Sequence, residues 1–426
     1  MPDFHQNIVP TFTRLETEDL ARMESTIQQS FRRTPVGVII PALFQDLSSP
    51  AMRHIIDELS SMSFVKRVYV SLDRASKQEF QRAREIVKPL KETGALLWND
   101  APEVQKVVQK INEVLPVGPR GKGQAIWTAL GYALGKGEVA VIAFHDADIL
   151  TYDRGFVLRL LYPVVHLRYQ FAKGFYARYS DRLNGRVTRL FYYPFVKAMR
   201  DILPKNDFLD YMADFRYPLS GEFATFASIA SELLFPSDWG IEVGILSELY
   251  RIMRPHRMCQ VEITSRYDHK HQELGDSATS GLSKMASDIA RTFFSRLSAG
   301  GCVLNSDFLR TVKHTYLANA RSYVHTYEAF ADVNNIPRFD QHQELATIEL
   351  FAAGLDKAFA EYSDLLFGSP LIADWRRIEV ALEGTSSELV NAFDSVAIGT
   401  AASGAAVDSY QPPQAAAGAA TPMRGQ

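Results

Sequence analysis

The sequence lacks the features that mark several whole classes of protein. Its 426 residues contain only two cysteines, Cys259 and Cys302, a count typical of a reducing compartment rather than of a disulfide-stapled secreted domain. No apolar run approaches the roughly 18 residues of a membrane-spanning helix, and the N-terminus, MPDFHQNIVP, lacks the basic and apolar regions of a secretory leader. We therefore expect a cytoplasmic protein without a membrane anchor.

Basic residues are also not gathered into long runs, and the net charge is −3. A polyanion is held mainly by clustered positive charge, so we expect no nucleic-acid partner. With 46% hydrophobic and 22% charged residues the composition is that of a globular protein. The length exceeds the roughly 250 to 300 residues that one core usually serves, which predicts two lobes or an enlarged domain with appendages.

The first 150 residues alternate between strand-like and helix-like segments. A charged, helix-prone stretch over 16–33 ends at Thr34-Pro35, and a strand is expected at Val36–Ile40. Further strands are predicted over 65–72 and 94–99, and helices over 76–91 and 102–115. This alternation predicts an α/β fold, a doubly wound, mostly parallel sheet of Rossmann-like βαβ units.

The second half is less regular. An alanine-rich helix is predicted after Glu222, a strand over 259–264, and helices from about 277 to 390. The final segment, rich in Ala, Gly, Pro and Ser, cannot bury enough surface to order itself. We therefore divide the chain into five parts. These are an N-terminal helical segment (1–34), a first α/β half (35–150), a second half (151–300), a helical C-terminal region packed on the core or on a second subunit (301–397), and a disordered tail (398–426).

The chain is organised around residues 139–148, VAVIAFHDAD. The apolar run predicts a buried parallel strand, so Asp146 and Asp148 follow its carboxyl end, where open α/β sheets bind ligands. Residues two apart on an extended strand end point the same way, so both carboxylates can face one divalent cation and, through it, a diphosphate. This arrangement is what a nucleotide-sugar transferase needs. A solvated Asp pair that caps the next turn is the alternative.

Two turns carry residues suited to phosphate. Residues 119–123, PRGKG, open a helix, so backbone N–H groups and Lys122 can meet a phosphate or a nucleobase edge; a simple helix-capping turn is the alternative. The loop is not a Walker A motif, because its spacing is wrong and Gln124 stands where Ser or Thr is required. In residues 185–188, GRVT, Arg186 suits a phosphate or carboxylate, or else lies on a solvated turn.

Three further residues are candidates. His269 and His271 follow the predicted strand over 259–264, and either imidazole can complete a metal site begun by Asp148; a histidine-rich surface turn is the alternative. Glu242, beside Trp239 and an apolar run, is either a carboxylate in a pocket wall or a structural cap.

The order of these segments resembles the glucosyl-3-phosphoglycerate synthases, which are retaining glycosyltransferases with a GT-A fold. The shared features are a strand ending in PAL, a PxGKG loop, a strand ending in D-x-D, and the GRVT, PLxGE and GIEVG segments followed by a late histidine. They cover roughly residues 35–300, and the last three segments in register are far more specific than D-x-D alone. The resemblance implies a GT-A fold with a helical C-terminal appendage, a nucleotide-sugar-binding half over 35–150 and an acceptor-binding half over 151–300.

The resemblance also implies roles for particular residues. Asp148 and His269 would hold Mg²⁺ or Mn²⁺, and Lys122 and Glu242 are the catalytic candidates. Gln45 stands where the family has Glu, and His271 where it has an Asn that helps to hold the acceptor. The donor would be held by Pro41, Ala42, Leu43, Gln45, Ser71, Lys122, Asp146 and Ala147, with Trp239, Gly240, Ile241 and Glu242 at the glucose, and the acceptor by Gly185, Arg186, Val187, Thr188 and His271.

The function expected on this basis is the metal-dependent transfer of glucose from UDP-glucose to 3-phosphoglycerate with retention, by a protein that we expect to be a homodimer. Alternatives within the class are a synthase that uses free glycerate, or one that uses another nucleotide sugar such as GDP-mannose. An alternative of another class is a non-catalytic, nucleotide-sugar-binding scaffold. Intact Asp146, Asp148, Glu242 and His269 argue against the scaffold.

Overall fold

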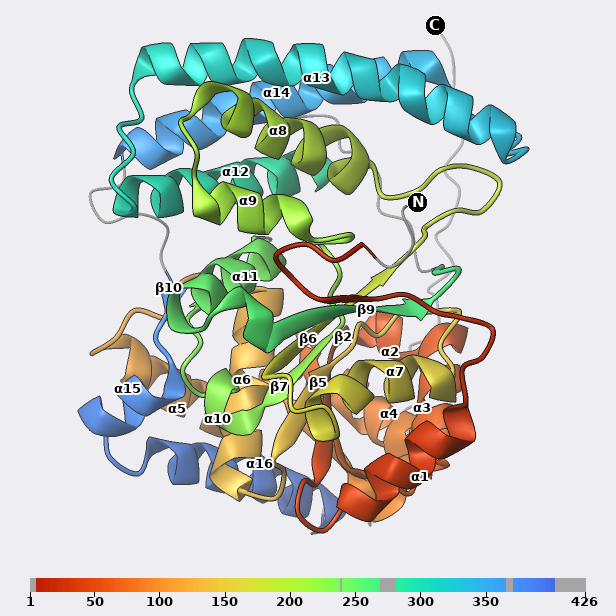
Figure 1. Ribbon diagram of the computed structural model, residues 1–426. Helices are drawn as coiled ribbons and strands as arrows, with labels where there is room; N and C mark the ends of the chain where they lie inside the picture. The colour runs from red at the N-terminus through yellow and green to blue at the C-terminus, as the bar shows by residue number, and fades with distance from the viewer. Residues whose placement is uncertain (1–4, 238–239, 269–280, 365–370, 403–426) are drawn as a thin grey trace, which may run out of the picture.

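The protein consists of an α/β core with a layer of helices on one side of it (Figure 1). The structure is a computed structural model that describes residues 5–237, 240–268, 281–364 and 371–402. The core holds one eight-stranded sheet with the order β1-β9-β6-β7-β5-β2-β3-β4. Its strands are β1 Thr11–Phe12, β2 Val36–Leu43, β3 Val65–Asp73, β4 Gly94–Trp98, β5 Val141–Phe144, β6 Phe171–Tyr176, β7 Phe223–Phe226 and β9 Met258–Thr264.

The sheet is parallel except at β7, which runs antiparallel to both of its neighbours, β5 and β6. The prediction of an alanine-rich helix directly after Glu222 is wrong. Phe223–Phe226 is a strand, and only the short α10, Ala227–Ala230, is helical. Pairing on both edges outweighs the helix propensity of Ala224 here, whereas Ala227 and Ala230 do lie in a helix. Phe223 stacks on Phe144 of β5, with ring centroids 4.3 Å apart.

Helices pack on the sheet, as the alternation of strand-like and helix-like segments predicts. Helix α6 packs on β2 and β3 and is covered by α16, which also contacts α5; helix α7 packs on β5, β6, β7 and β9 and is covered by α1. The core helices are α1 Leu20–Ser30, α2 Phe44–Leu47, α3 Pro50–Ser60, α4 Lys77–Val87, η1 Lys88–Thr93, α5 Pro102–Asn112, α6 Lys122–Lys136, α7 Arg154–Val165, α11 Ile241–Ile252 and η3 Pro255–Arg257.

The helical layer is formed by two parts of the chain. The middle of the chain contributes a short π-helix, and the C-terminal region lays α13 and α14 over it, with α13 outermost (Figure 1). Its members are η2 Val187–Tyr192, α8 Tyr193–Ile202, α9 Asp207–Asp214, α12 Gly281–Ala299, α13 Ser306–Val333 and α14 Gln341–Asp364. Buried aromatics join the layer together, with Phe191 packed against Tyr316 and Phe351.

The chain then returns to the α/β core. A small antiparallel sheet pairs β8, Phe235–Pro236, with β10, Leu371–Ile372. Trp375, in α15 (Trp375–Ala381), stacks on Trp127 with centroids 4.7 Å apart, and each indole donates a hydrogen bond across the contact, to Trp127 O and Ala373 O. Helix α16, Thr385–Ala402, runs into the segment predicted to be a tail; residues 403–426 lie outside the described residues.

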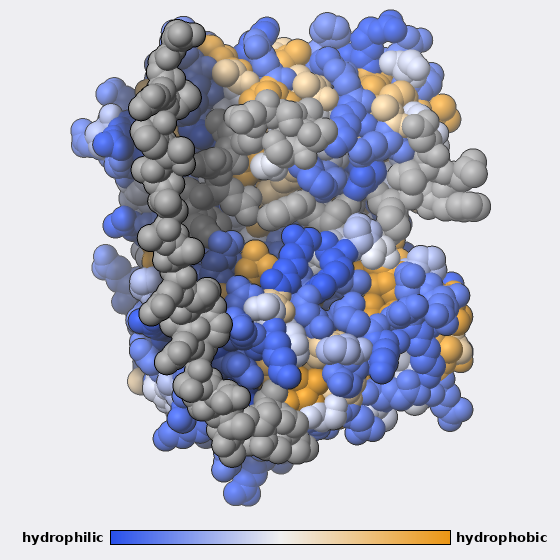
Figure 2. All heavy atoms as spheres, turned by 180° about the vertical axis from the view of Figure 1, so that it is seen from behind, coloured by the Kyte–Doolittle hydropathy of each residue, from blue (hydrophilic) through white to orange (hydrophobic). Residues whose placement is uncertain are grey.

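The surface bears no large apolar patch on the face seen in Figure 2, where hydrophobic residues form small, separate areas among hydrophilic ones wherever grey atoms do not cover them. None of the helices in the described ranges is long and apolar enough to cross a membrane. Cys259 and Cys302 are both free thiols.

Candidate active site

The carboxyl end of β5 brings the predicted donor residues together. Ile39 of β2 pairs with Phe144 of β5, and the His145 N–H donates to Ile39 O at 3.1 Å. Pro41, which is still paired with Ser71 of β3, and Asp146 each lie two residues further along, so both lie at the same end of the sheet. The fold therefore places residues 41–43 beside Asp146, Ala147 and the half-buried Asp148.

Lys122 forms the centre of a charged cluster at this edge. Its Nζ lies 2.7 Å from Asp146 Oδ1 and 3.0 Å from Glu242 Oε1. Lys122 is the first residue of α6, so the turn predicted over 119–123 delivers it to the end of β5. Burial lowers the pKa of Lys122, but the charges of Asp146 and Glu242 outweigh burial and raise it above its ordinary value. The ammonium is therefore fixed in its charged form between two carboxylates.

Glu242 reaches the cluster from α11. It occupies the first turn of this helix, after Gly240 and Ile241, and only 7% of the residue is exposed. The Lys122 ammonium, 3.0 Å away, and the positive end of the helix dipole both face this carboxylate. Trp239, which is predicted to line the glucose site with these residues, lies outside the described residues.

The turn over 218–222, PLSGE, packs directly on Asp146. A Cβ at Gly221 would lie 2.7 Å from both carboxylate oxygens of Asp146, so a larger residue would have to displace this carboxylate. The next residue, Glu222, is fully buried and accepts hydrogen bonds from the hydroxyls of Tyr176, Tyr267 and Ser220, each at 2.8 Å. Burial and the nearby Asp146 charge raise the pKa of Glu222, although the three hydroxyls oppose the rise.

A stack of tyrosines continues from Glu222 towards the GRVT turn. The rings of Tyr176 and Tyr267 lie face to face, 3.8 Å apart, and Tyr217 packs on the other side of Tyr176 at 4.8 Å. The Tyr217 hydroxyl accepts from Arg178 Nη1 at 2.9 Å and would lie 3.0 Å from a Cβ at Gly185. Unbroken contact therefore joins Asp146 to the predicted acceptor turn.

The GRVT turn leads into η2. Gly185 has φ +71°, which L residues adopt only with strain, and Val187 and Thr188 are buried. Arg186 lies at the start of η2, and its Nε donates to Glu344 Oε1 of α14 at 3.2 Å. The helical layer thus holds the arginine predicted to meet the acceptor.

Four buried charged residues beside these sites were not predicted from the sequence: Lys173, Arg189, Glu222 and Glu344. Lys173 interrupts the apolar strand β6, which is itself a signal because isolated lysines are seldom fully buried. Its Nζ donates to Ser220 O, and burial lowers its pKa to about 8 against the opposing charges of Glu242 and Glu222. No local pattern in the sequence distinguishes Glu344 from an ordinary solvated helix residue.

Two predicted donor residues lie apart from the charged cluster. The Ser71 side chain is fully buried, where its hydroxyl donates to Ala125 O and accepts from Asn99 Nδ2, both at 2.9 Å. Gln45 is exposed on α2. His269 and His271 lie outside the described residues, although the adjacent Asp268 O accepts from the Leu150 N–H at 2.8 Å, two residues after Asp148.

The oxygen ligands at the end of β5 fit a hard divalent cation. Carboxylates are the ligands that Mg²⁺ and Mn²⁺ prefer, and Asp146 and Asp148 supply them at one sheet edge. Within the described residues, no group of three His, Cys, Asp or Glu side chains is close enough to hold a metal ion by itself. A complete site therefore needs further ligands, and His269 remains the predicted one.

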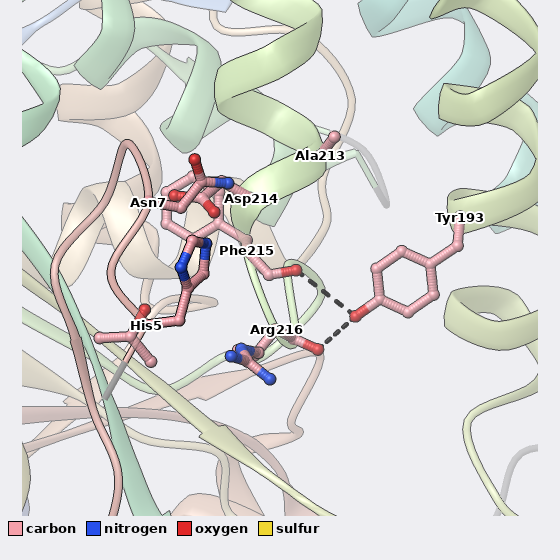
Figure 3. A pocket seen from close by; sticks show the side chains of 8 residues that line it. His5, Asn7, Tyr193, Ala213, Asp214, Phe215 and Arg216 are labelled. Atoms are coloured by element: carbon pink, nitrogen blue, oxygen red, sulfur yellow. Dashed lines mark hydrogen bonds between the residues drawn. The ribbon is translucent and has the colours of Figure 1, made fainter. Parts of the chain in front are cut away.

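A cavity also lies away from these residues. It has a volume of about 290 Å³ and lies between the N-terminal segment and helices α8 and α9 (Figure 3). The Tyr193 hydroxyl closes one side by donating to the carbonyl oxygens of Phe215 and Arg216. None of the predicted site residues lines this cavity. Its lining consists of His5, Asn7, Thr11, Tyr193, Ala213, Asp214, Phe215 and Arg216.

Comparison with known proteins gives the following similarities. No family model matches the chain. The chain is 39% identical to the glucosyl-3-phosphoglycerate synthase of Persephonella marina over 398 aligned residues. The alignment covers 92% of this chain and 98% of that relative. It is 32% identical over 404 residues to the synthase of Methanococcoides burtonii, with 92% and 97% covered.

Solved structures show the same fold. The glucosyl-3-phosphoglycerate synthase of Mycobacterium tuberculosis, in complex with Mn²⁺, uridine-diphosphate-glucose and phosphoglyceric acid, superposes with a TM-score of 0.51 at 20% identity, over 70% of this chain and 89% of that chain. This likeness confirms the predicted GT-A fold with its mostly parallel sheet.

Proposed function

Because the chain belongs to the glucosyl-3-phosphoglycerate synthase family, we propose that it transfers glucose from UDP-glucose to 3-phosphoglycerate with retention of configuration, giving glucosyl-3-phosphoglycerate. One observation of the structure supports this most strongly. The Lys122–Asp146–Glu242 cluster at the sheet edge and the GRVT turn are joined by direct contacts through Gly221, Glu222 and the tyrosine stack. Glycosyl transfer requires a donor site and an acceptor site held in a fixed relation, and this packed segment connects the two proposed sites.

The donor end is proposed to bind the nucleotide sugar at the edge of β2 and β5. Residues 41–43, with Gln45, would meet the uridine, Lys122, Asp146 and Ala147 the diphosphate, and the start of α11 the glucose. Asp146, Asp148 and Glu242 outnumber Lys122, so the described cluster by itself repels a diphosphate. A bound Mg²⁺ or Mn²⁺, held by Asp148 with His269, supplies the positive charge that neutralises the leaving group.

The acceptor end is proposed to bind 3-phosphoglycerate at the GRVT turn. Arg186 would meet the phosphate with a charge-assisted contact, while Gly185 and Thr188 shape the site and His271 completes it. The two ends carry opposite net charge, since Arg186 and Arg189 share the single carboxylate Glu344. An anionic acceptor is therefore attracted to this turn without a metal ion.

We also propose that the protein acts in the cytoplasm as a homodimer and does not bind nucleic acid. The free thiols suit a reducing compartment, and the net charge of −3 does not attract a polyanion. Phe330 and Val333 at the end of α13 are 53% and 81% exposed, which supports a contact surface there. Light scattering on the purified protein measures the mass directly, and a monomer at working concentration would exclude the dimer.

The test of the function is a panel of nucleotide sugars against 3-phosphoglycerate and free glycerate, with Mg²⁺ or Mn²⁺ present. Product mass identifies the sugar and the acceptor, and proton NMR of the anomeric position reports retention. We expect UDP-glucose with 3-phosphoglycerate to be the preferred pair. A preference for glycerate or for GDP-mannose would replace the assignment, and binding without transfer or hydrolysis would favour a scaffold.

A further inference from the structure

We propose that Glu344, in the helical layer, is a positioning residue that orients Arg186 for the acceptor phosphate. The proposal rests on the proposed function, because it takes Arg186 as the residue that meets the phosphate. It gives the C-terminal helical region a role in acceptor choice.

Glu344 is a buried carboxylate shared by two arginines. Only 4% of the residue is exposed. Its Oε1 lies 3.2 Å from Arg186 Nε, and its Oε2 lies 2.8 Å from Arg189 Nη1. A buried carboxylate is costly unless it is paired and hydrogen-bonded, and these two contacts supply its partners and hold it in one place. Glu344 also stands in the first turn of α14, where the helix dipole favours a negative charge.

Arg189 anchors the carboxylate to the turn. Its Nε donates to Asn184 O at 2.9 Å, its Nη2 donates to Leu183 O at 3.1 Å, and its guanidinium lies 4.8 Å from the centre of the Tyr327 ring. These contacts occupy the guanidinium with backbone and ring partners. Arg189 therefore fixes where Glu344 lies relative to the GRVT turn.

Arg186 is held on one edge only. Its Nε donates to Glu344 and its Nη2 to Gln343 Oε1, both on α14. No hydrogen bond of Nη1 with another described residue is present, and the side chain is 22% exposed, against 10% for Arg189. A guanidinium has a second edge, so an anion at Nη1 does not have to displace Glu344.

The balance of charges shows that Glu344 can orient Arg186 without cancelling the positive charge of the turn. Glu344 carries one negative charge and faces two guanidiniums, so one positive charge remains at the turn, where Arg186 is the more exposed partner. A lone, solvated arginine loses side-chain entropy when it binds phosphate. Glu344 removes much of that freedom beforehand and leaves the net charge needed for attraction.

A double-mutant cycle tests the proposal. Wild type, Glu344→Ala, Arg186→Ala and the double variant are compared by steady-state kinetics with 3-phosphoglycerate and with glycerate. We expect Glu344→Ala to lower kcat/KM for 3-phosphoglycerate about tenfold, mainly through the acceptor KM, and to leave the UDP-glucose KM within about twofold. The glycerate reaction should change little. In the Arg186→Ala background, Glu344→Ala should no longer alter the preference between acceptors.

A matched control comes from the same helix. Asp356 of α14 pairs with Lys313 of α13 at 2.6 Å and is 54% exposed, so Asp356→Asn breaks an α13–α14 ion pair away from the turn. It should leave the acceptor preference unchanged. If Glu344→Ala does not fold, Glu344→Gln keeps the volume and enters the same cycle, with a smaller expected loss.

Two outcomes overturn the proposal in distinguishable ways. Equal losses for both acceptors in the Glu344 variants, or losses that multiply independently in the double variant, would make Glu344 a structural residue and leave the proposed function intact. If Arg186→Ala itself did not discriminate between the acceptors, the acceptor assignment would fall, and the positioning role with it.

Discussion

The donor end and the acceptor turn differ in charge and in how they are supported. At the donor end, carboxylates exceed cations, and the cluster is built from residues at the ends of β5 and of helices α6 and α11. At the acceptor turn, arginines exceed carboxylates, and Arg186 rests on Glu344, 158 residues later in the chain. On the proposed assignment, we therefore expect the donor end to need a cation before it holds a diphosphate, and the acceptor turn to hold a phosphate directly.

Asp148→Ala tests the donor side of this contrast and has the largest expected effect. Loss of a charged ligand should reduce metal-dependent transfer by about 1000-fold or more, while the melting temperature stays nearly unchanged because the side chain is only half-buried. Initial rates across a metal titration measure the loss. Asp307→Ala, an 86% exposed carboxylate of α13, is the control. Wild-type turnover in Asp148→Ala would remove this residue from the site.

Arg186→Ala tests the acceptor side. Loss of a charge-assisted contact should cost about 2–4 kcal/mol in kcat/KM for 3-phosphoglycerate, or roughly 30- to 1000-fold, with little change in the UDP-glucose KM. Arg186→Lys should recover only part of the loss, because an ammonium lacks the planar fork. Glycerate should be the poorer substrate of the wild type and should lose less. A wild type that prefers glycerate would contradict the acceptor assignment.

Removal of the metal separates the two ends in one experiment. With a chelator present, UDP-glucose binding should weaken by roughly 100-fold, because the excess carboxylates then face the diphosphate unscreened. Binding of 3-phosphoglycerate should change by less than about threefold, since its site is already positive. Calorimetry with each ligand, with and without the chelator, gives both values. Equal weakening would show that the two ends are not electrostatically independent.

The buried Lys173 donates a hydrogen bond to the Ser220 carbonyl oxygen, close to the donor cluster, and should make the stability of the protein depend on pH. Its pKa falls from 10.5 to about 8 on folding, so between these values the unfolded chain binds more protons than the folded one. The stability of the wild type relative to Lys173→Met should therefore rise with pH across this window, by up to about 3 kcal/mol. Denaturant unfolding of both proteins at pH 7.5, 9 and 10.5 measures the difference. A difference that shrinks with rising pH would be the wrong sign.

The smallest effect is expected from the C-terminal residues 403–426. Their composition does not support a core, so their removal should change the free energy of unfolding by less than about 0.5 kcal/mol and leave both substrate KM values unchanged. A longer truncation, which removes residues 385–426, is the contrasting variant. It deletes α16 with the buried Leu389 and Phe393, and should destabilise the protein by several kcal/mol, roughly as other large core losses do. Similar behaviour of the two truncations would mean that 403–426 contribute to folding.

The sequence by itself determined the elements around the donor end. The strand before Asp146, the helix that begins at Lys122 and the βαβ alternation all follow from hydrophobic periodicity and turn residues within about 15 positions. Parallel strands must also end at one edge, so the meeting of residues 41–43 with Asp146 follows from the strand pattern. The division into domains and the roles of individual residues stay predictions.

Only the tertiary structure decided the antiparallel entry of β7, the burial of Glu222 under three hydroxyls, the return of α16 to α6, and the pairing of Arg186 with Glu344. Each of these joins segments whose local signals are weak or contrary, as with Ala224 in β7. A buried charge is set by the partners that packing brings to it, and those partners lie up to 158 residues away. Local periodicity carries no information about which distant side chain will fill that place, so the energy of the packed core makes the choice.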